Sequence, residues 1–371
     1  AIRKVENGVS PELEMGRFFA RKVSRVRVPR LAGALEYWRE GREPATLAIL
    51  QKYAANQGDA WSYTLDRLRG YFEGVRAGRD LDPPPSVSVL ELSAREPTKR
   101  AQQAIGDYLD SARLLGRRTA ELHRALGSGA GHPSFVPESL SPAYRRSLHR
   151  SLQAHTARIF SQLRERLHEL PPRVGADGAR VLAEESEIVR RFRAIRGDHR
   201  LGRRLRCHGD YHLGQVLCTG SDFVIIDFEG EPARPLRERR EKHSPLRDVA
   251  GMLRSFDYAV YAALGAEPAP DFPRLEPAAR SFRDFSSAAF LRGYLDAAHS
   301  RNFLPPSRSE LSFLLDLMIL EKAIYEMGYE INHRPDWLGI PVRAVLEALD
   351  PQRRRGATSP VAASSIDGER K

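Results

Sequence analysis

Cysteine is nearly absent from this 371-residue sequence, which contains only Cys207 and Cys218. Two cysteines cannot form the disulfide framework of a small secreted domain, and we expect both to be reduced and buried. The sequence also lacks any run of about 18 apolar residues, the length that a membrane-spanning helix needs. Its first residues, AIRKVE, lack the apolar stretch of a signal peptide. We therefore expect a cytoplasmic protein with no membrane partner.

Lysine is also scarce, with seven among the 59 basic residues, so arginine carries most of the formal net charge of +11. A basic protein raises nucleic acid as a partner. However, the densest basic run, RRFRAIRGDHRLGRRLR from Arg190 to Arg206, lacks the aromatic interleaving of a single-strand platform. Acidic residues are interspersed through most of the chain. We therefore expect no nucleic-acid partner.

The pattern of apolar residues predicts an α+β protein in three parts. Residues 1–56 form a small α+β part, with a helix over 10–19 capped by Ser10 and strands over 28–38 and 46–53. Residues 57–350 form a mostly helical domain, which two short apolar runs around Val216 and Ile225 interrupt. Residues 351–371 lack periodicity and are expected to be disordered. The expected helices of the large domain are 59–74, 105–126, 142–169, 178–196, one from 246, and 281–299, 309–330 and 341–349.

Two stretches rich in reactive side chains adjoin the short apolar runs: CHGDYHLGQVL, residues 207–217, and FVIIDFEG, residues 223–230. One interpretation is a hydrolytic metal site, because His208, Asp210 and His212 alternate and side chains two apart face the same way in an extended segment. Zinc would need more ligands. No further H-x-x-x-H or C-x-x-C motif supplies them elsewhere.

The other interpretation is phosphoryl transfer, in which a protein positions a nucleophilic hydroxyl and holds Mg²⁺ against the phosphates. The kinase catalytic loop runs H-R-D-x-x-x-x-N. Here His208-Gly209-Asp210 is followed at the same five-residue offset by Gln215. Asp210 would accept the hydroxyl proton, and Gln215 would offer an amide oxygen to Mg²⁺. Asp227 ends the next apolar run, as the metal-binding acid of the D-F-G motif does.

The neighbouring residues leave alternatives open. Glu229 replaces the glycine of D-F-G, and it is either a metal or water ligand or a structural acid paired with an arginine of residues 237–240. His208 is either a catalytic base or a residue that packs beneath the loop and hydrogen-bonds its backbone. His212 is either a sugar or phosphate contact or an exposed loop residue.

Four stretches in this order resemble maltokinase: HGDYHLGQ from His208, DFEGEP from Asp227, RERREKHSPLRDVAGMLRSF over 237–256, and NHRPDWLGIP from Asn332. Maltokinases belong to the aminoglycoside-phosphotransferase-like kinases and often occur fused behind a trehalose synthase domain. The resemblance extends over most of residues 3–349. It implies a protein-kinase-like bilobal fold with a mostly helical C-terminal lobe.

The resemblance implies ATP-dependent phosphorylation of maltose at its anomeric hydroxyl, which gives maltose 1-phosphate for α-glucan synthesis. Maltose, ATP and Mg²⁺ would be the ligands, and a trehalose synthase domain or protein a partner. Asp210 would be the catalytic base, with Gln215 and Asp227 as Mg²⁺ ligands. The supporting residues that it implies are the loop brace Arg247 and Asp248, the adenine-binding hinge Gln51, Lys52 and Tyr53, and Glu14 as partner of the phosphate-binding lysine.

A sugar site needs aromatic faces that stack on rings and polar groups that bind hydroxyls. The candidates are His212, Tyr325, Tyr329, Glu330, Asn332 and Trp337. For two of them, Tyr325 and Tyr329, the alternative is a packed stripe on one helix face, because they are four residues apart.

The resemblance places the phosphate-binding lysine and a phosphate-covering hairpin immediately upstream of Ala1. We therefore expect a truncated N-terminal β lobe, and a chain that binds its sugar but does not turn over ATP. Two other functions stay open: another small-molecule kinase of the same fold, of the aminoglycoside or sugar type, and a non-catalytic module. The joint presence of Asp210, Gln215 and Asp227 favours a kinase.

Overall fold

The fold is given by a computed structural model that describes residues 6–21, 26–79, 83–129, 132–298 and 303–350. Its helices are α1 Pro11–Arg21, α2 Ala60–Arg76, α3 Val89–Ser93, α4 Lys99–Ile105, α5 Tyr108–Leu126, α6 Pro142–Arg166, α7 Pro172–Ala183, α8 Glu185–Ala194, α9 Leu236–Arg239, α10 Leu246–Gly265, α11 Phe272–Ala298, α12 Arg308–His333 and α13 Gly339–Leu349. Its strands are β1 Leu31–Tyr37, β2 Ala45–Gln51, β3 Glu138–Ser139, β4 Arg203–Arg204, β5 Val216–Cys218 and β6 Phe223–Ile225. The predicted disordered tail, 351–371, lies outside the described residues.

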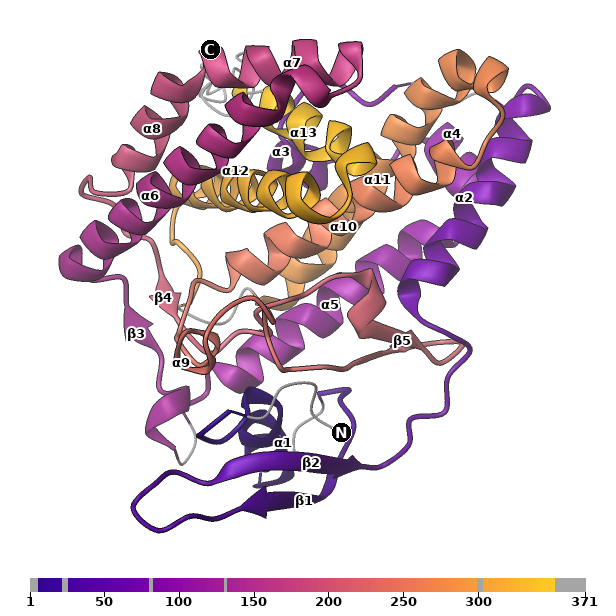
Figure 1. The fold of residues 1–371 in the computed structure, drawn as a ribbon. Coiled ribbons are helices and arrows are strands. Elements are labelled where there is room, and N and C mark those ends of the chain that lie inside the picture. Colours follow the sequence, from indigo (N-terminus) through magenta and orange to yellow (C-terminus); the bar gives the residue numbers. More distant parts are fainter. Residues whose placement is uncertain (1–5, 22–25, 80–82, 130–131, 299–302, 351–371) are drawn as a thin grey trace, which may run out of the picture.

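The small N-terminal part contains the predicted helix and both predicted strands. Ser10 caps α1, because its hydroxyl accepts a hydrogen bond from the backbone N–H of Leu13 at 3.1 Å. Strands β1 and β2 pair antiparallel, and Figure 1 shows this hairpin and α1 together at one end of the molecule. The hairpin exposes the large apolar side chains Leu35 and Leu50.

The remainder is mostly helical, as predicted. Helix α11 packs along α5, and α10 packs against α2, α11 and α12. In Figure 1 the ribbon that carries β5 runs between this group of helices and the β1–β2 hairpin. The two stretches with reactive side chains therefore lie at the junction of the two parts of the molecule.

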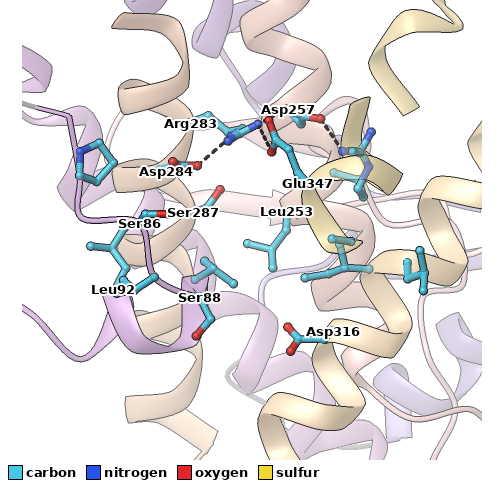
Figure 2. Close-up of a pocket in the computed structure, with 18 of the residues that line it drawn as sticks. Ser86, Ser88, Leu92, Leu253, Asp257, Arg283, Asp284, Ser287, Asp316 and Glu347 are labelled. Atoms are coloured by element: carbon cyan, nitrogen blue, oxygen red, sulfur yellow. Dashed lines mark hydrogen bonds and ion pairs between the residues drawn. The ribbon is translucent and has the colours of Figure 1, made fainter. Parts of the chain in front are cut away.

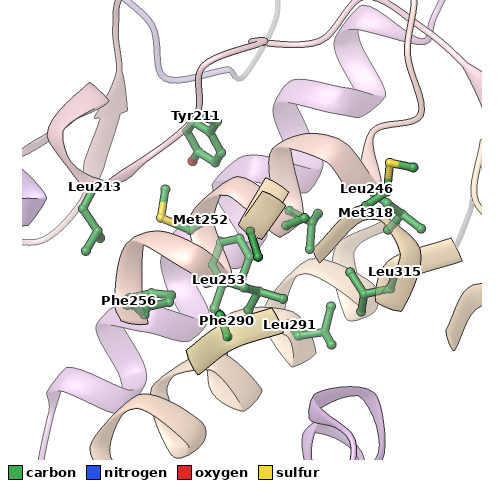
Figure 3. Close-up of a cluster of buried hydrophobic side chains, with 14 of the residues drawn as sticks. Tyr211, Leu213, Leu246, Met252, Leu253, Phe256, Phe290, Leu291, Leu315 and Met318 are labelled. Atoms are coloured by element: carbon green, nitrogen blue, oxygen red, sulfur yellow. The ribbon is translucent and has the colours of Figure 1, made fainter. Parts of the chain in front are cut away.

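A dense apolar core supports that junction from the helical side. Figure 3 shows Tyr211 and Leu213, which follow the HGD motif, beside Met252 and Phe256 of α10. All four side chains are buried. At Gly251 of α10 a Cβ atom would come within 2.7 Å of the Tyr211 carbonyl oxygen. The helix thus approaches the loop more closely than a side chain would permit.

Several predicted helices are wrong in their extent: α11 begins at Phe272 and not near 281, and Ile105 ends α4 and does not belong to the helix that runs to Leu126. The segment expected as a single helix over 178–196 is two helices, α7 and α8, that meet at Glu184. Helix α7 packs mainly against α13 and also contacts α6, whereas α8 packs mainly against α6. The two helices therefore differ in their main partner, which the apolar spacing alone does not distinguish. Among the described helices, none is long and apolar enough to cross a membrane.

Candidate active site

The HGD motif is held in place by a buried carboxylate of α10. Asp248 accepts hydrogen bonds from the backbone N–H groups of His208 at 2.8 Å and Gly209 at 3.0 Å. It also lies 3.0 Å from Nε2 of His123. Burial opposes its ionisation, but these donors outweigh burial and hold the pKa of Asp248 below its usual range. An ionised acceptor therefore fixes the backbone that leads into Asp210.

Arg247, the predicted second member of the brace, is half-buried beside Asp248. Burial acts to lower the pKa of Arg247, but Glu321 and then Asp248 outweigh it and raise the pKa above its ordinary value. The Arg247 guanidinium thus stays protonated, and Glu321 of α12 and Asp248 are the acids that act on it most strongly.

His208 lies beneath the loop, with both ring nitrogens engaged inside the protein. Its Nε2 is 2.9 Å from the carbonyl oxygen of Ile226, and its Nδ1 is 3.4 Å from the backbone nitrogen of Asp210. The ring packs on Phe228 at a centroid distance of 4.9 Å. These contacts favour the packing interpretation of His208 over a role as base. They also tie the HGD motif to the segment that carries Asp227.

Gln215 and Asp227, the two predicted metal ligands, are brought together. The side-chain amide of Gln215 donates a 2.9 Å hydrogen bond to the Asp227 carboxylate. Asp227 has a φ of 63°, and no other non-glycine residue in the described ranges has a positive φ. Aspartate tolerates this left-handed region better than most residues, and such strain gathers at functional sites.

This donor set fits Mg²⁺. Two protein ligands with oxygen atoms leave positions for water and phosphate, as Mg²⁺ prefers. Zinc, in contrast, takes three or four protein ligands, and the described residues contain no group of three or more His, Cys, Asp or Glu side chains arranged to hold a metal ion. His212 directs its Nδ1 to the backbone N–H of Gly214 at 3.1 Å. The geometry therefore favours the phosphoryl-transfer interpretation over a zinc site.

Glu229 takes the structural alternative, because Nη1 of Arg239 donates to its carboxylate at 3.2 Å. Beside it lies an acid that the sequence did not single out. Glu12 of α1 accepts hydrogen bonds from the backbone N–H of Phe228 and the side chain of Gln51. Burial, with smaller repulsion from Asp227 and Glu229, raises the pKa of Glu12 to about 7.

Glu14, predicted to pair with a phosphate-binding lysine, has other partners. Its carboxylate accepts from the buried Arg206 and from Nε of Arg240 at 3.2 Å. These two arginines outweigh burial and lower the pKa of Glu14. Of the two acids on α1, Glu12 is thus the one that contacts the D-F-E segment. No motif distinguishes it from Glu14 in the sequence; only the orientation of α1 does.

The predicted hinge begins at Gln51, the last residue of β2. The backbone N–H of Lys52 donates to the carbonyl of Arg30 at 2.8 Å, while the Tyr53 side chain is 80% exposed. Gln51 turns its side chain inward to Glu12. The hinge segment then runs beside β5, where the backbone N–H of Gln57 donates to Cys218.

Around Asp210 the structure gathers two of the predicted sugar residues and two that were not predicted. Tyr325 hydrogen-bonds Glu231, and burial together with the charges of Glu231 and Asp210 raises its pKa. Lys322 lies 3.9 Å from Glu231 and 4.7 Å from the Tyr325 ring centroid. Burial lowers the pKa of His212, and Asp210 and Lys322 are among the charges that act on it. The unpredicted pair, Glu231 and Lys322, comes from a loop and a helix that no local motif connects.

The other predicted sugar residues engage protein groups at the end of α12. Glu330 is 1% exposed and binds the Tyr258 hydroxyl at 2.9 Å and Arg334 at 2.7 Å. Trp337 stacks on Tyr258 and lies 4.9 Å from the Arg334 guanidinium. Two further contacts stay within this segment: Tyr329 stacks on His333, and the Asn332 side chain donates to the backbone carbonyl of Gly328.

Known proteins resemble the chain in sequence and in fold. No family model matches it. It is 25% identical over 321 residues to the glucosamine kinase of Streptacidiphilus jiangxiensis, a match that covers 85% of the chain and 60% of that protein. It is 30% identical over 147 residues to the glucosamine kinase of Mycolicibacterium smegmatis (strain ATCC 700084 / mc(2)155), covering 38% of the chain and 34% of that protein.

A solved structure of a glucosamine kinase in complex with glucosamine, ADP and inorganic phosphate superposes with a TM-score of 0.66 at 22% identity. The match covers 94% of the chain and 74% of that structure. A second crystal form of a glucosamine kinase gives a TM-score of 0.63. The chain therefore has the kinase-like fold of these enzymes and spans about 60% of the length of the first curated relative. The division into two lobes stays a prediction.

Proposed function

We propose that the chain is the phosphoryl-transfer part of an ATP-dependent sugar kinase. This proposal rests on one observation: the Gln215 side chain contacts Asp227 beside the HGD motif, and Asp248 holds the backbone of that motif in place. A binding module has no chemical reason to keep a base and two metal ligands in this arrangement. The likeness to glucosamine kinases in sequence and fold supports the same conclusion.

In the proposed reaction the Asp210 carboxylate accepts the proton of a sugar hydroxyl. That oxygen forms a bond to the γ-phosphorus of ATP, while the bond from the γ-phosphorus to the β–γ bridging oxygen breaks and ADP leaves. Gln215 and Asp227 would hold Mg²⁺, which neutralises negative charge on the phosphates when bound. His208 acts as a positioning residue, because it joins the backbone of Asp210 to that of Ile226.

The proposed acceptor is an amino sugar of the glucosamine type. Glu231 is 9% exposed and belongs to the group around Asp210, and a carboxylate there would pair with a protonated sugar amine. Maltose, suggested by the resemblance to maltokinases, is the second candidate. A disaccharide would need free aromatic faces, whereas Trp337 already stacks on Tyr258 and contacts the Arg334 guanidinium.

The test compares glucosamine, glucose and maltose as acceptors in a coupled ADP assay on the complete protein, alongside calorimetric titrations on the 371-residue chain. We expect kcat/KM and affinity to be highest for glucosamine, and Glu231→Gln to remove that preference. Highest values for maltose would favour the second candidate. The absence of ADP release with every sugar, together with the absence of sugar binding, would contradict the sugar-kinase proposal.

A further inference from the structure

A hollow lies within the helical part, and none of the residues assigned above to the candidate active site lines it. It is a cavity of about 620 Å³ among α3, α8, α10, α11, α12 and α13, with residues 83–88 along one side. Small-molecule sites are concave, mostly apolar and furnished with a few polar groups. The cavity has this character: Leu92, Leu253, Leu317 and Leu320 are among its lining residues.

One wall of the cavity carries a buried ionic cluster. Asp257 bridges two guanidinium groups, at 2.9 Å from Nη1 of Arg283 and in contact with Nη1 of Arg254. Arg283 also pairs with Asp284 at 2.8 Å and with Glu347 at 3.0 Å. Figure 2 shows Asp257, Arg283, Asp284 and Glu347 together on one side of Leu253.

Two donors of this cluster have no acceptor. The Nη2 atoms of Arg254 and Arg283 are buried and have no hydrogen-bond partner in the part of the chain that the structure describes. Both side chains are more than nine-tenths buried and line the cavity. A buried donor without a partner is costly, so an acceptor supplied by a ligand would stabilise this wall. Carboxylates already surround the guanidinium groups, which favours a neutral acceptor over an anion.

The opposite wall carries a carboxylate with one long hydrogen bond and one neighbouring cation, Arg191 of α8, whose charge acts to lower the carboxylate pKa. Asp316 of α12 lies across Leu253 from the ionic cluster in Figure 2. Its hydrogen bond from the Ser312 hydroxyl is 3.4 Å long. The side chain remains accessible to solvent, although burial raises its pKa to about 6. Both properties are expected of a carboxylate that projects into a hollow. Few water molecules solvate such a carboxylate, so its contact with a bound cation would be strong.

We propose that this cavity is a second ligand site, for a small organic ammonium compound with an apolar body and a neutral hydrogen-bond acceptor at its far end. The ammonium group pairs with Asp316 and the body packs against Leu253 and its apolar neighbours. The acceptor receives the Nη2 hydrogens of Arg283. The site is independent of sugar phosphorylation, because its groups come from the other side of α10 and α12.

The probe is 3-(4-methoxyphenyl)propylamine, titrated calorimetrically at pH 7.5 into the chain without sugar or nucleotide. Its alcohol and carboxylic acid counterparts have the same body but a neutral or negative head. We expect the amine to bind and both counterparts to bind at least about tenfold more weakly, since a charge-assisted contact is lost. Asp316→Asn should reduce amine binding by a similar factor. Asp177→Asn, which removes a half-buried carboxylate of α7 outside the cavity, should not.

A second variant tests the site even if Asp316→Asn does not fold. Ala348→Phe places a ring in the cavity and should abolish binding of the amine while the circular dichroism spectrum stays that of the wild type. Absence of amine binding to the wild type would overturn the proposal. So would equal affinity for the amine and the alcohol, or wild-type affinity in Asp316→Asn. None of these results depends on whether the protein phosphorylates a sugar.

Discussion

The side-chain amide of Gln215 lies 2.9 Å from the carboxylate of Asp227, although 12 residues separate them. The contact arises because β5 and β6 pair antiparallel with Val216 opposite Ile225, which brings the preceding and following residues to the same end of the hairpin. Amide groups of glutamine have an oxygen as well as a nitrogen, so a half-turn of the Gln215 amide would present two oxygen ligands at one point.

We expect Asp210→Asn in the complete protein to lower kcat by about 10²–10⁴, the usual cost of losing a general base. Sugar affinity should change little, because the amide keeps the size and polarity of the side chain. A coupled ADP assay and a calorimetric titration with glucosamine measure the two quantities. Asp110→Asn, an exposed change on α5, is the control and should leave both unchanged. Near-wild-type turnover by Asp210→Asn would contradict the assignment of the base.

Asp227 permits a test that separates chemistry from backbone strain. Asn tolerates positive φ at least as well as Asp, whereas the β-branched Val does not. We therefore expect Asp227→Asn to keep the free energy of unfolding within about 0.5 kcal/mol of the wild type and Asp227→Val to lose about 1–2 kcal/mol. Both variants should lose Mg²⁺-dependent ADP release, and zinc should not restore it. Urea unfolding and a Mg²⁺ titration provide the measurements; an Asn variant with unchanged Mg²⁺ dependence would exclude Asp227 as a ligand.

The sequence predicted the parts of this site that a short stretch encodes. The spacing from Asp210 to Gln215 and the position of Asp227 after an apolar run are local, and antiparallel pairing of two short strands brings them together. Glu12 and Glu231 were missed because their proximity to the site depends on how α1 and a loop are oriented, which no local pattern records. The helix predicted over 178–196 failed for the related reason that its first half packs mainly on α13 and its second half mainly on α6.

Glu12 predicts a pH dependence of stability. Its pKa is raised from an ordinary 4.5 to about 7 in the folded chain, so between these pH values the folded state binds a proton that the unfolded state has released. Stability therefore falls as pH rises from about 4.5 and stops falling above about 7, by roughly 3 kcal/mol at most. Urea unfolding of the 371-residue chain at a series of pH values measures the slope.

Glu12→Gln is the matched variant, since a neutral amide has no proton to lose. We expect it to flatten the stability profile between pH 5 and pH 7 and to be more stable than the wild type at pH 8. Glu6→Gln changes a half-buried acid nearby and should preserve the wild-type slope. An unchanged slope in Glu12→Gln would assign the pH dependence to another group.

The close approach of α10 to the HGD motif predicts opposite effects for two glycines of the same helix. At Gly251 a Cβ atom would meet the backbone oxygen of Tyr211 at 2.7 Å, whereas at Gly265 it would have nothing within 4 Å. Gly251→Ala should therefore cost about 1–3 kcal/mol, as overpacking against backbone does. It should also lower kcat, because Asp248 and Ser255 on this helix hold the backbone of the loop.

Gly265→Ala, at the end of the helix, should be neutral or stabilise by up to about 1 kcal/mol. Thermal and urea unfolding with the ADP assay test both variants. If Gly251→Ala retained wild-type stability and turnover, the helix would have room to move, and the loop would not depend on its position.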